Sequence, residues 1–566
     1  MMRILCAGLL ALSSTVAVAA PPPVTGFIVQ WREDAPAAQR MQALAGTRGT
    51  ALRAGAQITG RWQRLAANTA MSAAEAEAWA NTLRADPRLA AVVPDTREQR
   101  LDVSANDARF AQQWWLQAVA AGNTGAAGFS TAWSRSTGAP SLGAGAVVAV
   151  LDSGITSHPE LNARVLTGHD FVSDSVYAND GNGRDNDPSD PGDAISAAER
   201  SGNPAAFGGC PDAPLSSWHG TVIAGQVAAV SNNTEGVAAG NWFGRVLPVR
   251  VAGKCGAAVS DIVDGLRWAA GLPVSGVANN PNPARVIVLS YGGADACDLA
   301  SGTPTVAATA KLYTDAIAEA RQAGALVVVA AGNQRSAVGR PASCSGAFGV
   351  AALNREGYKA SYSNLGSGIA LATPGGDANS GGTCDAQLAD SGIVSTGNLG
   401  DTGPGSAGYV AASGTSFAAP AVAAAASLML ALNPALTVAQ LEDGLRRSAR
   451  PHVLVPLLGN CAVGSNAGRC ACTAGTCGAG MLDADQALAY AADPVAYAAP
   501  QRTAATLADD RIRACAVLLG RVPPEDPVTP PPADGGGGGG GGASSTAWLL
   551  GLGLAVLALR RQRPAR

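Results

Sequence analysis

The sequence predicts an α/β fold in which a doubly wound, mostly parallel sheet carries helices on both faces, preceded by a small α+β module. Two observations support this prediction. Between residues 107 and 490, continuous runs of Val, Ile and Leu recur, as in strands that are buried on both faces. Stretches with helical spacing lie between these runs, and this alternation is typical of a parallel sheet whose strands are joined by helices.

The first element along the chain is an export signal. Residues 1–20 contain one early Arg, an apolar stretch and the small-residue ending Ala17-Val18-Ala19, which is the pattern of a secretory signal peptide. A short membrane anchor is the alternative. Export places the protein in an oxidising compartment, in which disulfides persist.

Residues 21–105 form a separate α+β module. Residues 25–31 alternate in polarity as a strand does, and residues 89–96 predict a second strand. Between them, residues 72–87 have helical spacing that begins with a capping pair, Ser72 and Glu75. A strand, a helix and a strand in this order predict one compact module.

The domain that follows spans residues 106–500. Its predicted strands are residues 145–152, 245–251, 284–293 and 324–333. Helical spacing occurs at residues 261–272 and 307–324, and the second of these helices ends at Gly324, as a helix C-cap does. Strands and helices therefore alternate along the domain, and no internal repeat is visible.

The C-terminal region differs in composition. Residues 501–545 are rich in Pro and Gly and predict an unstructured linker. Residues 546–566 join an apolar run to an Arg-rich end, and the run is short for a spanning helix, which needs about 20 residues. With residues 543–545 included, its length is borderline, and we expect it to enter the membrane with the Arg cluster in the cytoplasm. An apolar tail without a role is the alternative.

Composition excludes several classes of function. The net charge is −3 and 14% of the residues are charged, so that the chain has neither a basic patch for nucleic acid nor an acidic solvating tail. Gly (70 residues) and Pro (34 residues) are abundant, which disfavours helix-only and coiled-coil folds. We therefore expect no nucleic-acid partner.

The cysteines predict disulfides. Of the 11 cysteines, Cys6 lies in the signal peptide, which leaves an even number for the exported chain. The pairs that we predict are Cys210 with Cys255 and Cys297 with Cys344. Either disulfides or a metal site could form from a third group of cysteines, which consists of Cys461, Cys470, Cys472 and Cys477. Its C-x-C spacing, the lack of a nearby His and the exported setting favour disulfides.

Three reactive side chains lie at the ends of predicted elements. Asp152 ends the strand at residues 145–152, where ligand sites of open α/β sheets lie. His219 opens an apolar helix, and Ser416 opens a long Ala-rich helix whose free N–H groups and positive end suit a developing oxyanion. Each residue alone also has a structural explanation: a turn Asp, a structural His and an N-cap Ser.

These residues lie within longer sequence blocks. VAVLDSGI, HGTVIAGQVAA and SGTSFAAPAVA resemble the three signature blocks of the subtilisin-like serine proteases, in the same order. A fourth block, VVVAAGN, carries in that family the oxyanion-hole Asn, here Asn333. A fifth, VIVLSYGG, resembles the strand that pairs with the substrate backbone, here Ser290, Tyr291, Gly292 and Gly293.

The chain departs from the family pattern at two positions. The family often has a second His where this chain has Val222, and it commonly has Met where this chain has Phe417. Neither position belongs to the triad. The departures therefore bear on fine specificity and not on the reaction.

The resemblance implies a subtilisin-like fold and a secreted serine endopeptidase of broad specificity that acts on protein or peptide substrates through an acyl-enzyme. Asp152, His219 and Ser416 would form the triad, and Asn333 would stabilise the oxyanion. Gly292 and Gly293 would leave room for a substrate side chain in the first specificity pocket. We expect a monomer.

The resemblance also implies processing at both ends of the chain. Residues 21–105 would be an inhibitory propeptide that helps folding and is cut off between residues 97 and 106. An independent binding module is the alternative. The C-terminal segment resembles a bacterial sorting tail that is cut after export, which would leave the enzyme secreted or at the cell surface.

Residues 177–193 are a candidate calcium loop. Calcium takes six to eight oxygen ligands, and the loop offers five carboxylates: Asp180, Asp185, Asp187, Asp190 and Asp193. A solvated acidic loop is the alternative. Residues 231–237 weakly resemble another calcium loop of the family.

Two other functions fit parts of the sequence. One is a catalytically inactive, surface-tethered binding protein on the same fold, and the filled triad and oxyanion positions argue against it. The other is a serine esterase of the α/β-hydrolase class, which uses G-x-S-x-G and the order Ser, Asp, His. The chain has GTSFA and the order Asp, His, Ser, so that the peptidase is favoured.

Overall fold

A computed structural model describes most of the chain. The described residues are 23–32, 52–96, 103–139, 146–378 and 382–523. Three expected features lie outside these ranges: the signal peptide, residues 97–102 of the expected propeptide boundary, and the C-terminal segment 546–566.

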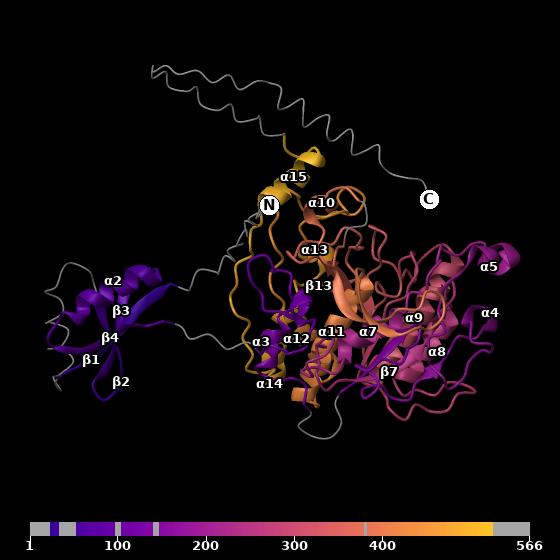
Figure 1. The fold of residues 1–566 in the computed structure, drawn as a ribbon, viewed down its shortest axis with the longest axis horizontal. Coiled ribbons are helices and arrows are strands. Elements are labelled where there is room, and N and C mark those ends of the chain that lie inside the picture. Colours follow the sequence, from indigo (N-terminus) through magenta and orange to yellow (C-terminus); the bar gives the residue numbers. More distant parts are fainter. Residues whose placement is uncertain (1–22, 33–51, 97–102, 140–145, 379–381, 524–566) are drawn as a thin grey trace, which may run out of the picture. The chain divides into compact units, whose positions relative to one another are not determined.

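A seven-stranded parallel sheet forms the centre of the large domain (Figure 1). Its order is β13-β12-β11-β10-β5-β7-β6, and every neighbouring pair is parallel. The strands are β5 (Val147–Asp152), β6 (His169–Asp170), β7 (Arg245–Arg250), β10 (Val286–Leu289), β11 (Leu326–Ala330), β12 (Phe348–Leu353) and β13 (Ile369–Pro374). The chain adds strands first on one side of β5 and then on the other, so that the strand order reverses beside β5. Ligand sites of such sheets lie at this point.

Helices cover both faces of the sheet. One face carries α7 (His219–Ala228), α11 (Thr415–Leu432), α12 (Val438–Ser448) and α14 (Ala484–Ala492). The other carries α8 (Val259–Ala269) and α9 (Pro304–Gln322). Alternate residues of β10 enter the two cores, since Val286 and Val288 pack with the first set and Ile287 and Leu289 with the second. The predicted doubly wound sheet is therefore confirmed.

Shorter elements complete the described part of this domain. They are η1 (Phe110–Gln112), η2 (Trp114–Leu116), α3 (Phe129–Trp133), α4 (Ser175–Ala178), α5 (Ala197–Gly202), α6 (Pro204–Phe207), β8 (Ala252–Gly253), β9 (Gly256–Ala257), α10 (Asp385–Leu388), β14 (Ile393–Asn398), β15 (Ala407–Ala412), α13 (Ala474–Cys477) and α15 (Asp510–Leu518). Helix α15 corrects the linker prediction, which began at residue 501. It is ordered because Ile512 and Cys515 are buried in the second core.

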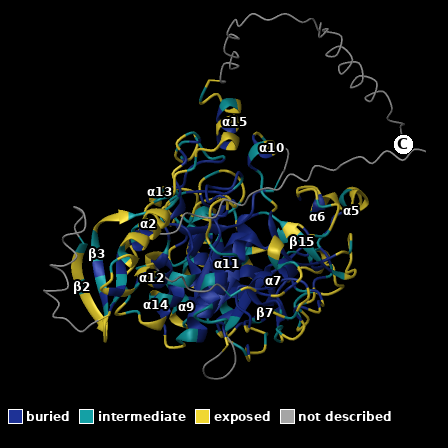
Figure 2. Cartoon of the chain, turned by 60° about the vertical axis from the view of Figure 1, so that its left-hand side comes forward, coloured by how far each residue is buried: buried dark blue, intermediate teal, exposed yellow. Residues whose placement is uncertain are grey.

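Helix α11 is the core helix of the domain. It is long and apolar enough to cross a membrane by length and composition, and it is the one helix in the described ranges with this property. Figure 2 shows it among the most deeply buried parts of the chain. Its small side chains allow close packing, since a Cβ added to Gly240 would lie 2.6 Å from the Cβ of Ala424.

Within residues 23–32 and 52–96, the N-terminal module contains a four-stranded antiparallel sheet and a helix. Its strand order is β2-β3-β1-β4, and the elements are β1 (Val24–Trp31), β2 (Leu52–Thr59), β3 (Trp62–Met71), α2 (Ala73–Arg84) and β4 (Leu89–Pro94). The predicted capping pair is present, because Ser72 and Glu75 form a reciprocal capping box. The sequence analysis predicted neither β2 nor β3. Strand β2 is largely exposed and lacks the alternation of a half-buried strand, and the second half of β3 is mostly exposed as well.

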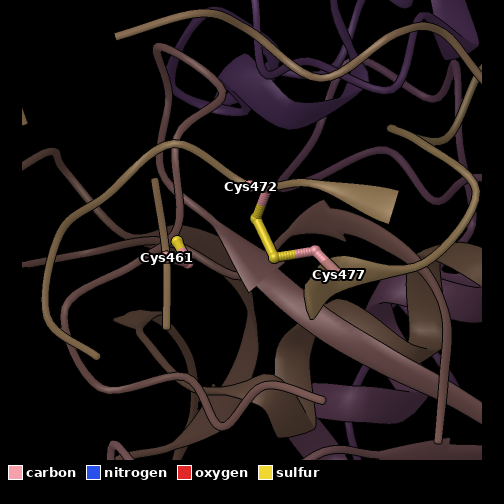
Figure 3. A group of neighbouring side chains, drawn as sticks. All are labelled: Cys461, Cys472 and Cys477. Atoms are coloured by element: carbon pink, nitrogen blue, oxygen red, sulfur yellow. A yellow bond between two sulfur atoms is a disulfide. The ribbon is translucent and has the colours of Figure 1, made fainter. Parts of the chain in front are cut away.

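Five disulfides link the described cysteines. The pairs are Cys210–Cys255, Cys297–Cys344, Cys384–Cys515, Cys461–Cys470 and Cys472–Cys477. The two predicted pairs are confirmed. The sulfurs of Cys461, Cys472 and Cys477 lie within 4.8 Å of one another, as metal ligands would. Figure 3 shows, however, that Cys472 and Cys477 are bonded to each other, so that disulfides form in place of a metal site.

Candidate active site

Asp152 and His219 meet at the carboxyl end of β5. Asp152 is the last residue of the strand and is 1% exposed, while His219 is the first residue of α7. His219 Nδ1 lies 2.7 Å from Asp152 Oδ1, and the N–H of Ser153 donates to the same oxygen at 2.8 Å. The carboxylate therefore holds the ring in one orientation and favours the tautomer with a proton on Nδ1.

The surroundings of His219 stabilise its charged form. Burial alone would lower the pKa of His219, but the negative charge of Asp152 and the hydrogen bond to it outweigh burial, and the pKa is raised. Asp193 and Asp190 add to this rise. A group of carboxylates around one imidazole is the environment of a base that must hold a proton during a reaction.

Ser416 lies in the first turn of α11, directly before Phe417. The ring of the next residue, Phe417, is 5.2 Å from the ring of His219, so that the start of α11 adjoins the imidazole. Ser416 is 7% exposed, and within the described residues its hydroxyl forms no hydrogen bond. Its N–H belongs to the first turn and has no acceptor within the helix. Both groups are therefore available to a bound molecule.

Asn333 is fixed to the same turn. Its Oδ1 accepts hydrogen bonds from the N–H and from the hydroxyl of Thr415, each at 2.9 Å. The hydroxyl of Thr415 in turn accepts from the N–H of Gly332 at 3.0 Å. These bonds occupy the oxygen of the Asn333 amide and leave its Nδ2 as a donor. A Cβ added to Gly414, two residues before Ser416, would lie 3.5 Å from this nitrogen.

Residues Ser290 to Gly293 continue the chain beyond the end of β10. Ser290 Oγ donates to the carbonyl oxygen of Ser416 at 3.3 Å, which joins this segment to α11. Gly293 N–H donates to the carbonyl oxygen of Arg340 at 2.9 Å. A Cβ added to Gly292 would lie 2.4 Å from the same oxygen. The backbone of Arg340, and not an empty pocket, therefore explains why this position is glycine.

Sequence reasoning missed a second layer of this site. Ser153 Oγ donates to Asp190 Oδ2 at 2.7 Å and accepts the N–H of Gly220 at 3.1 Å, so that it ties the end of β5 to the start of α7. Ser153 is part of the VAVLDSGI block. Asp190 lies 37 residues further along, and the fold alone brings it to this place.

Comparisons with known proteins show the family to which the chain belongs. Residues 143–480 match the Subtilase family. The chain belongs to the subtilase family. This subtilase is 40% identical over 482 residues to the "Extracellular protease" of Xanthomonas campestris pv. campestris, with 82% of this chain and 72% of that protein covered. It is 33% identical over 443 residues to the "Extracellular basic protease" of Dichelobacter nodosus, with 75% of this chain and 66% of that protein covered.

A solved structure has the same fold as this subtilase. A protease from Pseudoalteromonas arctica matches with a TM-score of 0.56 and 40% sequence identity, covering 69% of this chain and 99% of that one. The predicted subtilisin-like fold is thus confirmed, and the subtilase is a serine endopeptidase. The inactive binding protein and the α/β-hydrolase esterase are set aside by this result.

The five aspartates expected to bind calcium do not converge in this subtilase. Asp180 pairs with the buried guanidinium of Arg250 at 2.5 Å. Asp193 accepts from the N–H and the hydroxyl of Ser217 at 2.7 and 2.6 Å.

The other three carboxylates of the loop are also engaged by protein groups. Asp190 bonds to Ser153, as described, and burial raises its pKa to about 6. Asp185 and Asp187 accept backbone N–H groups of their own loop. The arrangement therefore does not fit calcium in this loop.

A second loop of the subtilase offers a better arrangement. Asp107 and Glu160 are 5% and 1% exposed, and both carboxylates accept hydrogen bonds from residues 231–237. Asp107 Oδ1 is buried and has no hydrogen-bond partner among the described residues. Burial raises the pKa of both groups, and the charge of Asp107 adds to the rise at Glu160. Two buried carboxylates that both accept from residues 231–237, one of them with an unpartnered oxygen, are ligands of the kind that a calcium ion takes.

Proposed function

We propose that this subtilase is a secreted serine endopeptidase of broad specificity in which Asp152, His219 and Ser416 form the catalytic triad. The observation that carries the proposal is the 2.7 Å hydrogen bond between His219 Nδ1 and Asp152 Oδ1, next to the first turn of α11. This bond leaves Nε2 as the ring nitrogen that accepts a proton.

The reaction follows from these roles. Ser416 Oγ attacks the carbonyl carbon of the scissile peptide, and its proton passes to His219 Nε2, which then delivers the proton to the leaving amine. Water attacks the resulting acyl-enzyme by the same proton path, which releases the second product and restores the serine. Asp152 stabilises the imidazolium that forms in each half.

Two donors would stabilise the oxyanion. Asn333 Nδ2 is oriented by the bonds that its Oδ1 receives from Thr415, and the N–H of Ser416 is free of an acceptor within the helix. Each such donor typically lowers the barrier by about 2.7–4 kcal/mol.

The substrate would bind as an extended strand along residues Ser290 to Gly293. Main-chain hydrogen bonds of this kind do not depend on the side chains of the substrate. Ser290 Oγ is bonded to the carbonyl of Ser416, so that a strand along this segment passes the nucleophile. This mode of binding supports broad specificity.

A serine-directed phosphonate tests the triad. We expect the purified enzyme to gain one phosphonate adduct on Ser416, and we expect Ser416→Ala to gain none and to lose peptidase turnover by about a million-fold. Mass spectrometry of the intact and digested protein locates the adduct. An adduct on another serine, or turnover that survives Ser416→Ala, would overturn the assignment.

We propose further that residues 21–105 are a propeptide and that the enzyme is made as a zymogen. The support is a core of its own, built from Phe27, Val29, Leu65 and neighbouring residues, in front of the domain that matches the family. Mass spectrometry of the secreted product should find an N-terminus between residues 97 and 106 in the wild type and an uncut chain in Ser416→Ala. A Ser416→Ala chain that is cut at the same place would show that cleavage does not require this active site.

Calcium is proposed at Asp107, Glu160 and residues 231–237, where it would stabilise the fold and take no part in the reaction. The support is the unpartnered Asp107 Oδ1 and the raised pKa of both carboxylates. We expect a calcium chelator to lower the melting temperature of the wild type and of Asp185→Asn, which alters the other loop. The chelator should have no effect on Asp107→Asn. The opposite pattern would place calcium at residues 177–193.

The location of the enzyme follows from the chain ends. We propose export by the signal peptide and release or surface retention after the C-terminal segment is cut. Two relatives, from Xanthomonas campestris pv. campestris and Dichelobacter nodosus, are extracellular proteases, which supports export. Cell fractionation with intact-mass measurement of the product tests both statements.

A further inference from the structure

The turn that carries the nucleophile is held from two sides. Residues 413–415, here called the nucleophile turn, are held on one side by Asn333 and Gly332, as described. On the other side, the N–H of Gly414 donates to the carbonyl of Gly375 at 3.0 Å. The N–H of Ala378 donates to Ser413 Oγ at 3.0 Å. The position of Ser416 therefore depends on residues 375–378.

Residues 375–378 are themselves fixed by a buried carboxylate. Asp377 is fully buried, and its oxygens accept from Ser361 Oγ at 2.7 Å and from Arg469 Nε at 2.7 Å. The hydroxyl of Tyr362 donates to the carbonyl of Gly375 at 2.9 Å. Removing the cation from such a buried pair leaves an uncompensated charge, which is strongly destabilising at that place.

Arg469 comes from the disulfide-rich segment that follows α12. Its side chain is 3% exposed, and besides Asp377 it contacts Asp385 at 2.6 Å and the carbonyl of Thr383 at 3.1 Å. The next residue, Cys470, is bonded to Cys461. Disulfides thus anchor the backbone on which the guanidinium depends.

The carboxylate partners of Arg469 are anchored in the same way. Between Thr383 and Asp385 stands Cys384, which is bonded to Cys515 of α15. The disulfide Cys461–Cys470 therefore lies next to Arg469 in the chain, and Cys384–Cys515 lies next to Asp385. The network runs from these disulfides through Arg469 and Asp377 to residues 375–378 and the nucleophile turn.

We propose that Arg469 is a positioning residue of the peptidase: through Asp377 it sets the place of the nucleophile turn, and the disulfides Cys461–Cys470 and Cys384–Cys515 hold it there. The inference rests on the proposed function, because it takes Ser416 as the nucleophile. Arg469 itself touches no reacting atom. Its effect is on the alignment of the Ser416 hydroxyl and N–H.

The proposal predicts which kinetic constant changes. A displacement of about 1 Å at a reacting group can cost roughly 100-fold in rate. The segment Ser290 to Gly293, where the substrate would bind, receives no hydrogen bond from Arg469 or Asp377 in the described part of the chain. Arg469→Met should therefore lower kcat by about 10- to 100-fold, while KM changes little.

Arg450 provides a matched control. Its side chain is 9% exposed against 3% for that of Arg469, and it donates to the carbonyls of Thr124 and Ala126. None of its described bonds reaches the nucleophile turn. Arg450→Met should therefore lower the melting temperature about as much as Arg469→Met does, and leave kcat near that of the wild type.

The experiment compares these variants on the secreted, matured enzyme. Active sites are counted by phosphonate titration, and kcat, KM, the rate of phosphonate labelling and the melting temperature are measured. We expect kcat and labelling to fall together in Arg469→Met, and Arg469→Lys to recover part of both because it restores a cation beside Asp377. If Arg469→Met does not fold, Arg469→Lys against Arg450→Lys makes the same comparison.

Cysteine substitutions test whether the disulfides hold Arg469 in place. The double substitution Cys461→Ser with Cys470→Ser should reduce kcat, whereas Cys210→Ser with Cys255→Ser, which removes a disulfide elsewhere, should not. Equal kcat in Arg469→Met and Arg450→Met, or no kcat difference between the two cysteine pairs, would overturn the proposal. Turnover that survives Ser416→Ala would instead overturn the proposed function, so that the two failures are distinguishable.

Discussion

At the scale of single residues, the charges around His219 set the pH at which it can act as a base. Its pKa is raised, so that the neutral ring forms only as the pH rises through a value above about 6.5. We expect kcat/KM to fall on the acid side with an apparent pKa above that value. A pH profile of kcat/KM between about pH 5 and pH 9 measures it.

Asp152→Asn tests whether His219 is the group that titrates, because it removes the charge beside the ring and keeps the size of the side chain. It should lower the acid-side pKa and reduce kcat on the order of ten-thousand-fold, because the tautomer is no longer enforced. An unchanged acid limb in Asp152→Asn would show that another group titrates.

The amide of Asn333 has two roles, since its oxygen accepts hydrogen bonds from Thr415 and its nitrogen would donate to the oxyanion. Asn333→Asp keeps an oxygen for the bonds from Thr415 and loses the Nδ2 donor, so that the turn stays in place and the oxyanion loses a partner. We expect kcat to fall by about 100- to 1,000-fold with little change in KM. A steady-state assay on a peptide substrate measures both. A loss confined to KM would mean that Asn333 binds the substrate and not the oxyanion.

The residues that could be predicted are those within continuous sequence blocks. Asp152, His219, Ser416 and Asn333 each lie in a short motif. Asp377 and Arg469 lie in no motif, and their contact joins residues 92 positions apart. Such a contact follows from the packing of loops and disulfides, which a single sequence does not reveal.

At the scale of elements, α11 depends on small side chains. Ala424 is fully buried, and a Cβ on Gly240 would already lie 2.6 Å from it. We expect Ala424→Leu to destabilise the fold by about 1–3 kcal/mol, because the added carbons have no space. Urea unfolding of an inactivated, phosphonate-treated enzyme measures the free energy. Ala435→Leu, at an exposed position just beyond the helix, is the control and should change little.

The strands of the central sheet differ in how well the sequence predicts them. Strands β5, β7, β10 and β11 were predicted because they are continuous runs of branched apolar residues. Strand β12 (Phe348–Leu353) was not, since it reads FGVAAL, with Gly and Ala in place of Val and Ile. Its place in the sheet comes from pairing with β11 and β13 on both sides.

At the scale of the whole molecule, the disulfides should differ in their effect on stability. Cys384–Cys515 closes a loop of 131 residues, and Cys472–Cys477 closes one of 5. In the chain-entropy description the longer loop contributes about 5 kcal/mol. Replacing Cys384 and Cys515 by Ser should therefore lower the guanidinium midpoint more than replacing Cys472 and Cys477 does. An equal loss in both variants would contradict the chain-entropy description.

The fold of the whole molecule was predictable to the level of its sheet and its helices, and the disulfide that joins Cys384 to Cys515 was not. Cys515 lies in residues expected to be a linker, and composition alone does not show that an Asp-capped helix there packs against α10 (Asp385–Leu388). Tertiary contacts override local composition at this point.

The bond between Cys384 and Cys515 has a practical consequence for a protease that encounters copies of itself. A nick between residues 481 and 514, beyond the stretch that matches the family, would not release α15, because sulfur still joins the fragments. Autolysed molecules would migrate as intact ones in non-reducing electrophoresis and separate into two bands only after a thiol is added. A preparation judged by the non-reducing gel alone would therefore look homogeneous although it contains nicked chains.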